Sequence, residues 1–414
     1  MDGTGAGSVK RVLLLGGGHA HLVAGPLLAA AVQGRASLAL VASSPRLLYS
    51  GMMPGWLAGQ YSFDECSIDL AEICARHGIE WIRDRIVDID FVSGHAIGER
   101  GSHRFDLASV NVGSENDPGH IDDDVGAGGG LAVFGAKPFA EFVERWNAWR
   151  GACSARPGPR TLMVAGGGAA AVEIAFALAH LAGTDNALRG SRVTLATASG
   201  ELLPGMSRVA ARIALSSLAA RGVEVRSGLR YCGAGAGAVR FEDGTSVLAD
   251  LVVVATGARS ADWLVRAAQR DAVALAPHGG LAVRSDLRST SHSSVFAAGD
   301  CAGFVDRTMP RSGVHALRQG PVLAANLARA LESGSSGGAV ASAGAGDAAD
   351  TGPGQAPLQR YVPRRWTLAL LNRCDGSAIG AWGPLGFAGD WAWRWKDGID
   401  RRFMARFPTG HAQV

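Results

Sequence analysis

The sequence predicts an α/β protein with two Rossmann-like dinucleotide-binding domains and a small C-terminal segment. The prediction depends on a pattern that occurs twice: an apolar run typical of a buried strand leads into three glycines and then into a helix of small residues. The first copy runs from Val12 to His21 and the second from Thr161 to Ala171. A second predicted strand follows each copy at βαβ spacing. Two such units indicate that one chain binds two dinucleotides.

Length and composition restrict the function classes. The 414 residues are too many for a single core and suit two domains. Basic residues exceed acidic ones by only 3, which gives no indication of nucleic acid as a partner. The apolar runs are shorter than the ~20 residues of a membrane span. Six scattered cysteines without C-x-x-C spacing favour a reducing compartment, so we expect a cytoplasmic protein.

Both glycine turns are expected to bind a pyrophosphate. Backbone N–H groups of such a turn approach the phosphates, and the helix that follows adds partial positive charge. The expected contacts are Gly16, Gly18, His19 and Ala20 in the first turn and Gly166, Gly168, Ala169 and Ala170 in the second. His21 takes the third glycine position of the first turn. Because His19 and His21 are two residues apart, they do not share a helix face, and no metal site is expected.

The residues that would bind the adenosine ribose are not the usual ones. An acidic residue commonly ends the second strand of such a unit and bonds the ribose. Here the first unit offers Ser43, and the second offers Thr197 and Ser199. Hydroxyl groups can bond a ribose or leave room for a 2′-phosphate. The choice between NADH and NADPH therefore stays open.

A third feature sets the order of the cofactors. The stretch Val295–Asp300 resembles the second FAD fingerprint of two-dinucleotide-binding flavoproteins, in which a strand-end aspartate bonds the ribityl chain. The resemblance implies that Gly299 and Asp300 bind FAD, although Asp300 could instead cap a helix. The strand-end residues Gly113 and Gly257 are further expected cofactor contacts. The predicted domains are 9–113 with 281–331 for FAD, 114–280 for NAD(P)H, a flexible linker over 332–357, and an aromatic, basic segment over 358–414.

Three motifs extend the resemblance: Gly-Gly-Gly-His-Ala-His at 16–21, Tyr-Ser-Gly-Met-Met-Pro-Gly at 49–55 and Trp-Arg-Trp-Lys-Asp at 393–397. With them, residues 9–331 resemble the pyridine nucleotide-disulfide oxidoreductase superfamily. The chain is most similar to type II NADH dehydrogenase-like flavoproteins, of the kind sometimes fused to selenophosphate synthetase. The resemblance implies FAD and NAD(P)H as cofactors. In those relatives the segment 49–55 covers the flavin, so Met53 and Pro54 are expected at the ring, or else in the core.

Four further residues are candidates for the site, and only the role of the first follows from the resemblance. It implies that Glu173 faces the nicotinamide and the flavin edge, whereas a carboxylate in the first helical turn could simply pair with the helix dipole. Lys137, between the two halves, is a second catalytic candidate or an ordinary surface lysine. His315 and Gln319 are expected to line the flavin pocket, or else to be ordinary core or surface residues. Disulfide reduction is disfavoured because no cysteine pair stands at either of the family's positions.

The predicted function is hydride transfer from NAD(P)H to FAD, followed by reduction of a quinone-like or other acceptor. The alternatives are a flavin-dependent reductase linked to selenium or sulfur metabolism, and a non-catalytic FAD-binding regulatory protein. The acceptor is linked to residues 390–407, where aromatic and apolar residues recur every fourth position on a basic helix. Such a helix suits the inner face of a membrane. Because Asp390, Asp397 and Asp400 dilute the basic face, packing on the protein's own body or on a second subunit is the favoured alternative, and the oligomeric state is open.

Overall fold

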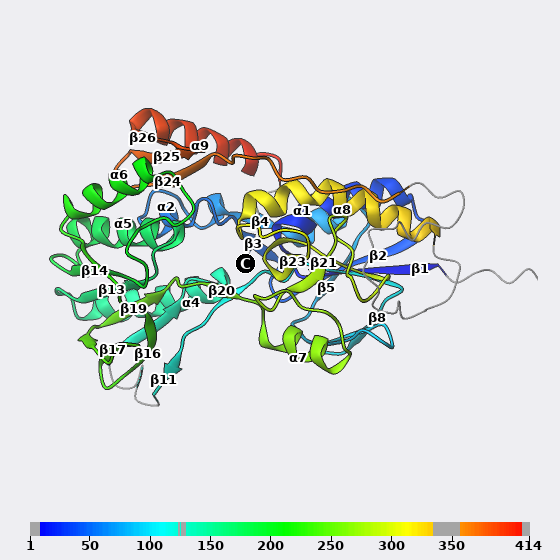
Figure 1. The fold of residues 1–414 in the computed structure, drawn as a ribbon, viewed down its shortest axis with the longest axis horizontal. Helices are drawn as coiled ribbons and strands as arrows, with labels where there is room; N and C mark the ends of the chain where they lie inside the picture. The colour runs from blue at the N-terminus through cyan, green and yellow to red at the C-terminus, as the bar shows by residue number, and fades with distance from the viewer. Residues whose placement is uncertain (1–8, 123–124, 126–129, 334–356, 408–414) are drawn as a thin grey trace, which may run out of the picture. The chain divides into compact units, whose positions relative to one another are not determined.

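The computed structural model describes residues 9–122, 125, 130–333 and 357–407 (Figure 1). These residues divide into two compact units. Unit 1 holds the described residues of Met1–Leu47, Asp69–Ser114 and Arg259–Pro363, and unit 2 holds those of Leu48–Ile68, Glu115–Ala258 and Arg364–Val414. Most of the predicted linker, residues 334–356, lies outside the described part.

Unit 1 is built on a five-stranded parallel sheet in the order β22-β9-β1-β2-β5. Its strands are β1 (Lys10–Leu15), β2 (Ala36–Ala42), β5 (Glu80–Arg83), β9 (Leu107–Val110) and β22 (Val295–Ala297). The central strand β1 is fully buried from Val12 to Leu15. Burial on both faces of a parallel sheet explains why this strand is a continuous apolar run in the sequence.

Helices cover one face of this sheet and a smaller antiparallel sheet covers the other. Helices α1 (His19–Val32) and α8 (Gly313–Ser333) lie side by side (Figure 1), and α3 (Leu70–Arg76) packs on β5. Strands β6 (Ile86–Asp90), β7 (His95–Gly98) and β8 (Ser102–Arg104) form the antiparallel sheet. Helix α7 (Asp262–Arg270) packs on β6 and buries Leu264 in the core that contains Leu13 and Leu15. Of the short elements near β22, β21 (Leu281–Val283) precedes it in the chain, and η3 (Gly299–Cys301) and β23 (Ala302–Phe304) follow it.

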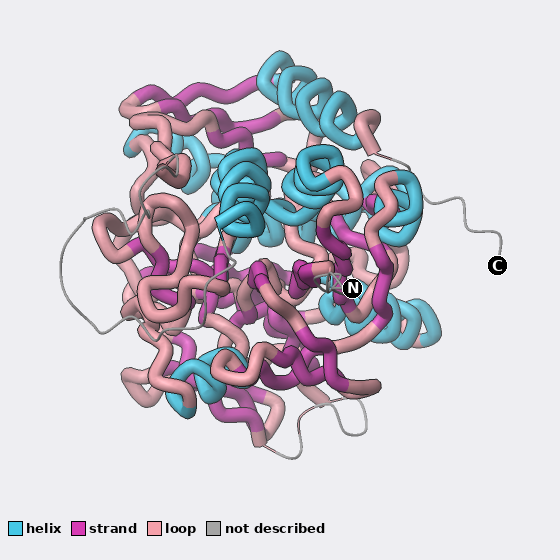
Figure 2. The backbone as a smooth tube through the Cα atoms, turned by 90° about the vertical axis from the view of Figure 1, so that its right-hand side faces the viewer, coloured by secondary structure: helices cyan, strands magenta, loops and turns pink. Residues whose placement is uncertain are grey.

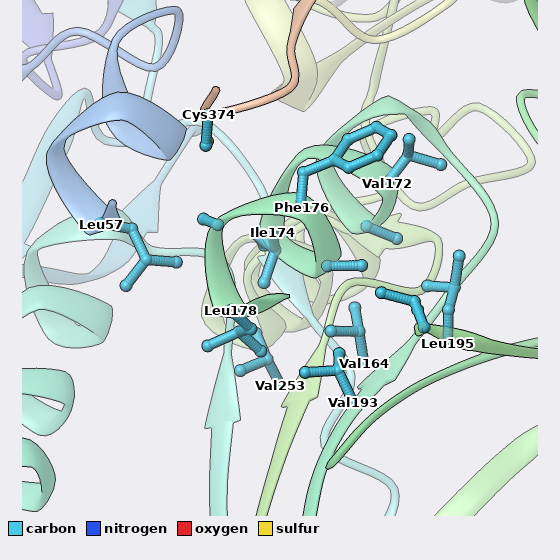
Figure 3. Packing of buried hydrophobic residues seen from close by; sticks show 14 of the residues in the cluster. Leu57, Val164, Val172, Ile174, Phe176, Leu178, Val193, Leu195, Val253 and Cys374 are labelled. Atoms are coloured by element: carbon cyan, nitrogen blue, oxygen red, sulfur yellow. The ribbon is translucent and has the colours of Figure 1, made fainter. Parts of the chain in front are cut away.

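Unit 2 repeats the plan with the sheet β12-β19-β13-β14-β15, also parallel. Its strands are β12 (Ala132–Gly135), β13 (Thr161–Ala165), β14 (Arg192–Thr197), β15 (Glu224–Ser227) and β19 (Leu251–Val254), and its helices are α4 (Phe139–Ala155), α5 (Ala169–Thr184) and α6 (Arg208–Ala219). Figure 3 shows the core in which Ile174 and Leu178 of α5 meet Val164 and Val253 of the sheet. A mixed sheet covers the other face, made of β11 (His120–Ile121), β16 (Tyr231–Gly235), β17 (Ala238–Phe241) and β18 (Ser246–Leu248), in which β11 pairs with β16 in parallel and the other pairs are antiparallel.

Two further segments complete unit 2. One contains the short helix α2 (Met53–Leu57) and η1 (Asp64–Cys66). The other contains the antiparallel strands β24 (Ala369–Asn372), β25 (Ala378–Trp382) and β26 (Leu385–Gly389), followed by helix α9 (Asp390–Met404). Leu57 and Cys374 lie in the same core as α5 (Figure 3).

The unit boundaries differ from the predicted domain boundaries in three segments. Residues 48–68, predicted in the FAD-binding part, pack in unit 2 because the apolar side chains of α2 are buried against α5. Residues 259–280, predicted in the NAD(P)H-binding part, lie in unit 1 because α7 packs on β6. Residues 364–407, predicted as a separate segment, pack on α5 and α6. Short paired strands occur where the chain passes between units, namely β3 (Arg46–Leu48) with β4 (Ser67–Asp69) and β10 (Glu115–Asn116) with β20 (Ala258–Arg259).

The predicted fold class is confirmed. Each unit alternates strands and helices around a parallel sheet. Figure 2 shows the helices in cyan and the strands in magenta. Within the described residues, no helix combines the length and the apolar character that crossing a membrane requires.

Candidate functional site

The first glycine turn closes around a buried asparagine. Gly16 has φ +91°, and a Cβ atom on Gly18 would lie 2.3 Å from Asn111 Oδ1. That oxygen accepts the N–H groups of Ala20 at 3.0 Å and His21 at 3.3 Å, so it caps the first turn of α1. The Asn111 amide donates to the Ala298 carbonyl at 2.7 Å. Asn111 thus joins three chain segments at the turn, and sequence reasoning missed it although a polar residue directly after a buried strand was a usable signal.

His21 fastens the same turn to strand β9. Its Nδ1 lies 2.7 Å from the Gly16 carbonyl oxygen and its Nε2 lies 2.8 Å from Ser109 Oγ. A carbonyl oxygen only accepts, so Nδ1 carries the proton and Nε2 accepts from the serine hydroxyl. Desolvation by burial lowers the pKa of His21 to about 4. A neutral imidazole therefore takes the place of the third glycine and bonds the helix to the strand.

Four predicted FAD contacts line one cavity in unit 1. The cavity has a volume of about 330 Å³, and its walls include Gly299, Asp300, His315 and Gln319. Gln319 Oε1 accepts the Gly299 N–H at 2.7 Å, and Ser114 donates its hydroxyl to Asp300 at 2.8 Å.

His315 is held by a residue that sequence reasoning did not single out. Its Nδ1 lies 2.8 Å from the Tyr361 hydroxyl. Desolvation lowers the pKa of His315, which favours the neutral ring. The cavity thus presents a carboxylate, an amide and a neutral imidazole, a set of groups that fits the hydroxyls of a ribityl chain and a flavin ring.

The remaining predicted contacts in unit 1 stand at the same edge of the sheet. Gly16 follows β1, the exposed Ser43 follows β2, Gly113 comes after β9, and Gly299 comes after β22. Carboxyl ends of parallel strands meet at one edge, where open α/β sheets bind ligands. His19, the first residue of α1, begins the helix at that edge. The structure therefore brings the predicted contacts of unit 1 together.

In the second glycine turn, Gly166 is tightly packed against the neighbouring chain, whereas Gly168, next to the helix, has free space beside it. Gly166 has φ +140°, and a Cβ there would lie 2.5 Å from the Ala255 carbonyl oxygen. A Cβ on Gly168, by contrast, would meet nothing within 4 Å. Helix α5 begins directly after it with Ala169 and Ala170. Free space beside a helix N-terminus is what an approaching pyrophosphate requires.

The hydroxyls that end β14 have partners within their own loop. Thr197 Oγ1 lies 3.2 Å from Ser199 Oγ, and Ser199 donates to the Glu201 carbonyl at 2.6 Å. Gly257, the other predicted contact, is exposed after β19. These contacts leave the choice between NADH and NADPH open.

The predicted catalytic residues both lie in unit 2. Glu173, in the second turn of α5, accepts the Asn372 N–H of β24 at 2.7 Å. Desolvation raises the pKa of Glu173 to about 7, while the charge of Lys396 and the bond from Asn372 act in the opposite direction. Lys137 follows β12 and is partly buried, and its backbone N–H donates to Asn116 Oδ1 at 2.8 Å.

Met53 and Pro54 are placed in the core of unit 2. Both are buried in α2, and Met53 belongs to the cluster that surrounds α5. Their predicted contact with a flavin ring stays a prediction, since core packing accounts for their burial.

Helix α9 buries a face other than its aromatic stripe. The buried residues are Ala392, Lys396, Asp400 and Met404. Trp391 is 48% exposed, Trp395 42% and Ile399 36%. Three residues of the stripe predicted over 390–407 are thus at the surface, whereas Phe403 and Phe407 are half-buried and the Phe403 ring lies 4.7 Å from that of Tyr49. Both alternatives for the stripe, contact with a membrane and packing on protein, stay predictions.

Residues 10–320 match the model of a family described as pyridine nucleotide-disulphide oxidoreductase. The chain belongs to this family. The assignment confirms the resemblance inferred from the sequence, together with FAD and NAD(P)H as the predicted cofactors. The family description places the protein among oxidoreductases that use a pyridine nucleotide. Its six cysteines all lie in the described part, and none forms a disulfide.

Similarity to individual family members is partial in sequence and extensive in fold. The chain is 32% identical over 222 residues to ferroptosis suppressor protein 1 from Taeniopygia guttata, covering 52% of each. It is 30% identical over 152 residues to type II NADH:quinone oxidoreductase from Haemophilus influenzae, covering 35% of this chain and 33% of the relative. The matches thus span about half or less of these curated relatives.

Two solved structures share the fold at low sequence identity. Sulfide:quinone oxidoreductase from Aquifex aeolicus matches with a TM-score of 0.73 and 15% identity, over 96% of this chain and 91% of its own. NDH2 from Plasmodium falciparum, solved in complex with NADH, matches with a TM-score of 0.72 and 10% identity, over 97% of this chain and 99% of its own. At such identities the likeness concerns the fold alone.

Proposed function

We propose that this oxidoreductase binds FAD in unit 1 and NAD(P)H in unit 2, and reduces a quinone or similarly lipophilic acceptor while resting on a membrane surface. The observation that carries the proposal is an exposed aromatic surface in unit 2, here called the aromatic face. Its members are Trp366, Trp382, Leu385, Phe387, Trp391, Trp395 and Ile399.

The aromatic face extends over three elements, β25, β26 and α9. Trp382 pairs with Leu385 and Gly380 pairs with Phe387 in the antiparallel register of β25 and β26. Side chains two apart on a strand share a face, so Trp382, Leu385 and Phe387 point the same way. The Phe387 ring stacks on Trp391 of α9 at 4.9 Å between centroids, which extends the surface onto the helix.

Such a surface suits the boundary between lipid and water. Monomeric soluble proteins rarely expose large contiguous apolar patches. Tryptophan is favoured at membrane interfaces because its ring is apolar while its N–H bonds water. The exposed Arg394 and Arg402 on α9, and the exposed Arg406 just beyond its end, add charge that anionic lipids attract. A lipophilic acceptor would be within reach of a protein bound in this way.

The residues of the two units support a division of roles. When bound, FAD supplies the two-electron chemistry, and the protein binds and aligns the reactants. Asp300, oriented by Ser114, would accept hydrogen bonds from the ribityl hydroxyls. The open second turn would hold the pyrophosphate of NAD(P)H. Glu173 would place a carboxylate near the nicotinamide, where negative charge favours the cationic ring formed as the hydride leaves.

The test uses purified protein and two readouts. Addition of NADH or NADPH should bleach the flavin absorbance, and a short-chain quinone should restore it. The protein should also float with anionic liposomes. Replacing Trp391 and Trp395 by serine should weaken liposome binding by about tenfold or more, given the apolar area removed. Leu248→Ser, at a residue 73% exposed on β18, is the matched control.

Two outcomes would contradict the proposal. A reduced enzyme that no quinone reoxidises would exclude the acceptor class. Liposome binding that is equal in the tryptophan variant and in the control would exclude the aromatic face as the contact.

A further inference from the structure

Helix α9 contains a buried ion pair that the proposed function does not use. Lys396 is 5% exposed and Asp400 is 4% exposed, and Lys396 Nζ lies 2.7 Å from Asp400 Oδ2. Other charged residues of this helix, such as Arg394 and Arg402, are exposed. Lys396 is also one of only three lysines in the sequence.

The pair fastens the segment Tyr49–Leu57 to the rest of unit 2. Lys396 Nζ donates to the Gly51 carbonyl, and Asp400 Oδ1 accepts the Tyr49 hydroxyl at 3.1 Å. Each partner of the ion pair therefore holds one point of the turn that leads into α2. Desolvation and the neighbouring Asp400 raise the pKa of Tyr49, so its hydroxyl keeps the proton that it donates.

The residues that directly follow Lys396 and Asp400 on α9 add a second attachment. Asp397 accepts the Tyr61 hydroxyl at 2.7 Å and pairs with Arg401 at 3.0 Å. Arg401 in turn pairs with Glu65 at 3.1 Å. The segment that follows α2 is therefore fixed to the same helix, by charged groups nearer the surface.

Stability alone does not account for the buried pair. Removing two charges from water costs free energy that their attraction only partly returns, and well-packed apolar residues often stabilise as much or more. An ion pair at this position is better explained by the geometry and the field that it imposes. Both partners reach the backbone or side chains of 49–51, which apolar residues could not hold at defined atoms.

The field of the pair acts on Glu173. Helix α9 packs on β24, whose Asn372 N–H bonds the Glu173 carboxylate. Lys396 lowers the pKa of Glu173 and Asp400 raises it. Cys374 is a further titratable group beside Glu173, and its thiol stays protonated because burial, followed by the charge of Glu173, raises its pKa; the charges of Arg221 and Lys396 lower the pKa of this thiol, and that of Asp375 raises it.

We propose that Lys396 and Asp400 are positioning residues for the reaction at Glu173: together they hold Tyr49–Leu57 in place, and they carry a positive and a negative charge on the helix that packs against the strand bonded to the Glu173 carboxylate. The inference rests on the proposed role of Glu173 beside the nicotinamide. As a hydride leaves NAD(P)H, the nicotinamide ring becomes a cation, and an ionised carboxylate stabilises that charge whereas a protonated one does not. Hydride transfer should therefore quicken as Glu173 loses its proton.

The two partners should shift the pH profile in opposite directions. The rate of flavin reduction by NADH is measured by stopped flow from pH 5.5 to 9. In Lys396→Met the midpoint of the profile should rise by about one pH unit, because a favourable charge near the carboxylate is lost. In Asp400→Asn it should fall, because a repelling charge is lost. A role limited to packing would not move the two midpoints in opposite senses.

Two further variants complete the test. Lys396→Arg keeps the charge and should return the midpoint most of the way to the wild-type value. Glu173→Gln should give a flat profile over the same range. The amides of 49–57 should exchange hydrogen faster in Lys396→Met and in Asp400→Asn than in the wild type, which reports the attachment independently of activity.

The outcomes separate the two proposals. A Glu173→Gln profile equal to that of the wild type would overturn the role of Glu173 and this inference with it. A flat Glu173→Gln profile, with unmoved midpoints in Lys396→Met and Asp400→Asn, would overturn this inference alone. Midpoints that move in the same direction in both variants would also contradict it.

Discussion

His21 makes the first dinucleotide-binding turn sensitive to acid. Its side chain is 1% exposed and bonds the Gly16 carbonyl and the Ser109 hydroxyl as a neutral imidazole. Protonation would place a charge in an apolar interior and would turn Nε2 from an acceptor into a second donor facing a hydroxyl. We therefore expect the protein to lose stability, and with it FAD, in a pH range that His21 sets.

The size of the effect follows from the pKa values. The pKa of His21 is about 4 in the folded protein, against 6.5 for an ordinary histidine. The unfolded chain therefore binds a proton that the folded protein rejects, and stability is lost as the pH falls from 6.5 towards 4. The loss between pH 7 and pH 5 amounts to about 2 kcal/mol. Below pH 4 both states are protonated and the contribution no longer changes.

The assay compares the wild type with His21→Gln, which cannot be protonated but can still donate and accept. Urea unfolding is followed at pH 7, 6 and 5 by the release of FAD fluorescence. Other titrating groups contribute equally to both proteins, so the difference between them isolates His21. The variant should be less stable at pH 7 and should lose about 2 kcal/mol less on going to pH 5. Equal pH dependence in both proteins, or an NMR titration of His21 near pH 6.5, would refute the reasoning.

Two further predictions concern the dinucleotide-binding turns. Gly168→Glu should raise the KM for NAD(P)H by about tenfold or more through repulsion of the pyrophosphate, while FAD content stays unchanged. Its control Gly168→Ala should behave like the wild type because a Cβ there meets nothing within 4 Å. Asp300→Ala should weaken FAD retention by about tenfold or more, measured by equilibrium dialysis, because a hydrogen-bonding carboxylate is removed. Ser114→Ala should have a smaller effect, since it only orients Asp300. Loss of FAD from Gly168→Glu would contradict the assignment of FAD to unit 1.

The fold class could be predicted because the two parallel sheets leave a strong local signature. Strand β1 and strand β13 (Thr161–Ala165) are buried on both faces, so each reads as an uninterrupted apolar run. Each ends at a glycine, Gly16 or Gly166, whose positive φ the turn requires. The apolar runs and the glycines that follow them are adjacent in the sequence, so a local sequence pattern is enough to predict them.

The unit boundaries could not be predicted in the same way. Residues 48–68 follow the first βα unit in sequence but bury Met53 and Leu57 against α5, more than 100 residues later. Residues 259–280 follow the second unit but return through α7 to β6. The local sequence of either segment does not indicate against which of the two sheets it packs.

Helix α9 shows the same limit at the level of one element. A four-residue spacing from Trp391 to Phe407 predicts an apolar stripe, and apolar stripes usually face a core. The structure instead buries Lys396 and Asp400, and these read in the sequence as an ordinary surface pair at i, i+4. Only the approach of Tyr49 and Gly51 distinguishes a buried pair from an exposed one.

The two glycine turns differ in a way that matches the proposed exchange of their ligands. In the first, Asn111 and His21 tie the turn to neighbouring strands through buried hydrogen bonds, so the loop is rigid before any ligand arrives. In the second, Gly168 and the start of α5 face free space. A preformed, enclosed turn favours slow release and suits a resident cofactor, because little ordering is left to oppose binding. An open turn permits rapid exchange, which a nucleotide consumed in every turnover requires.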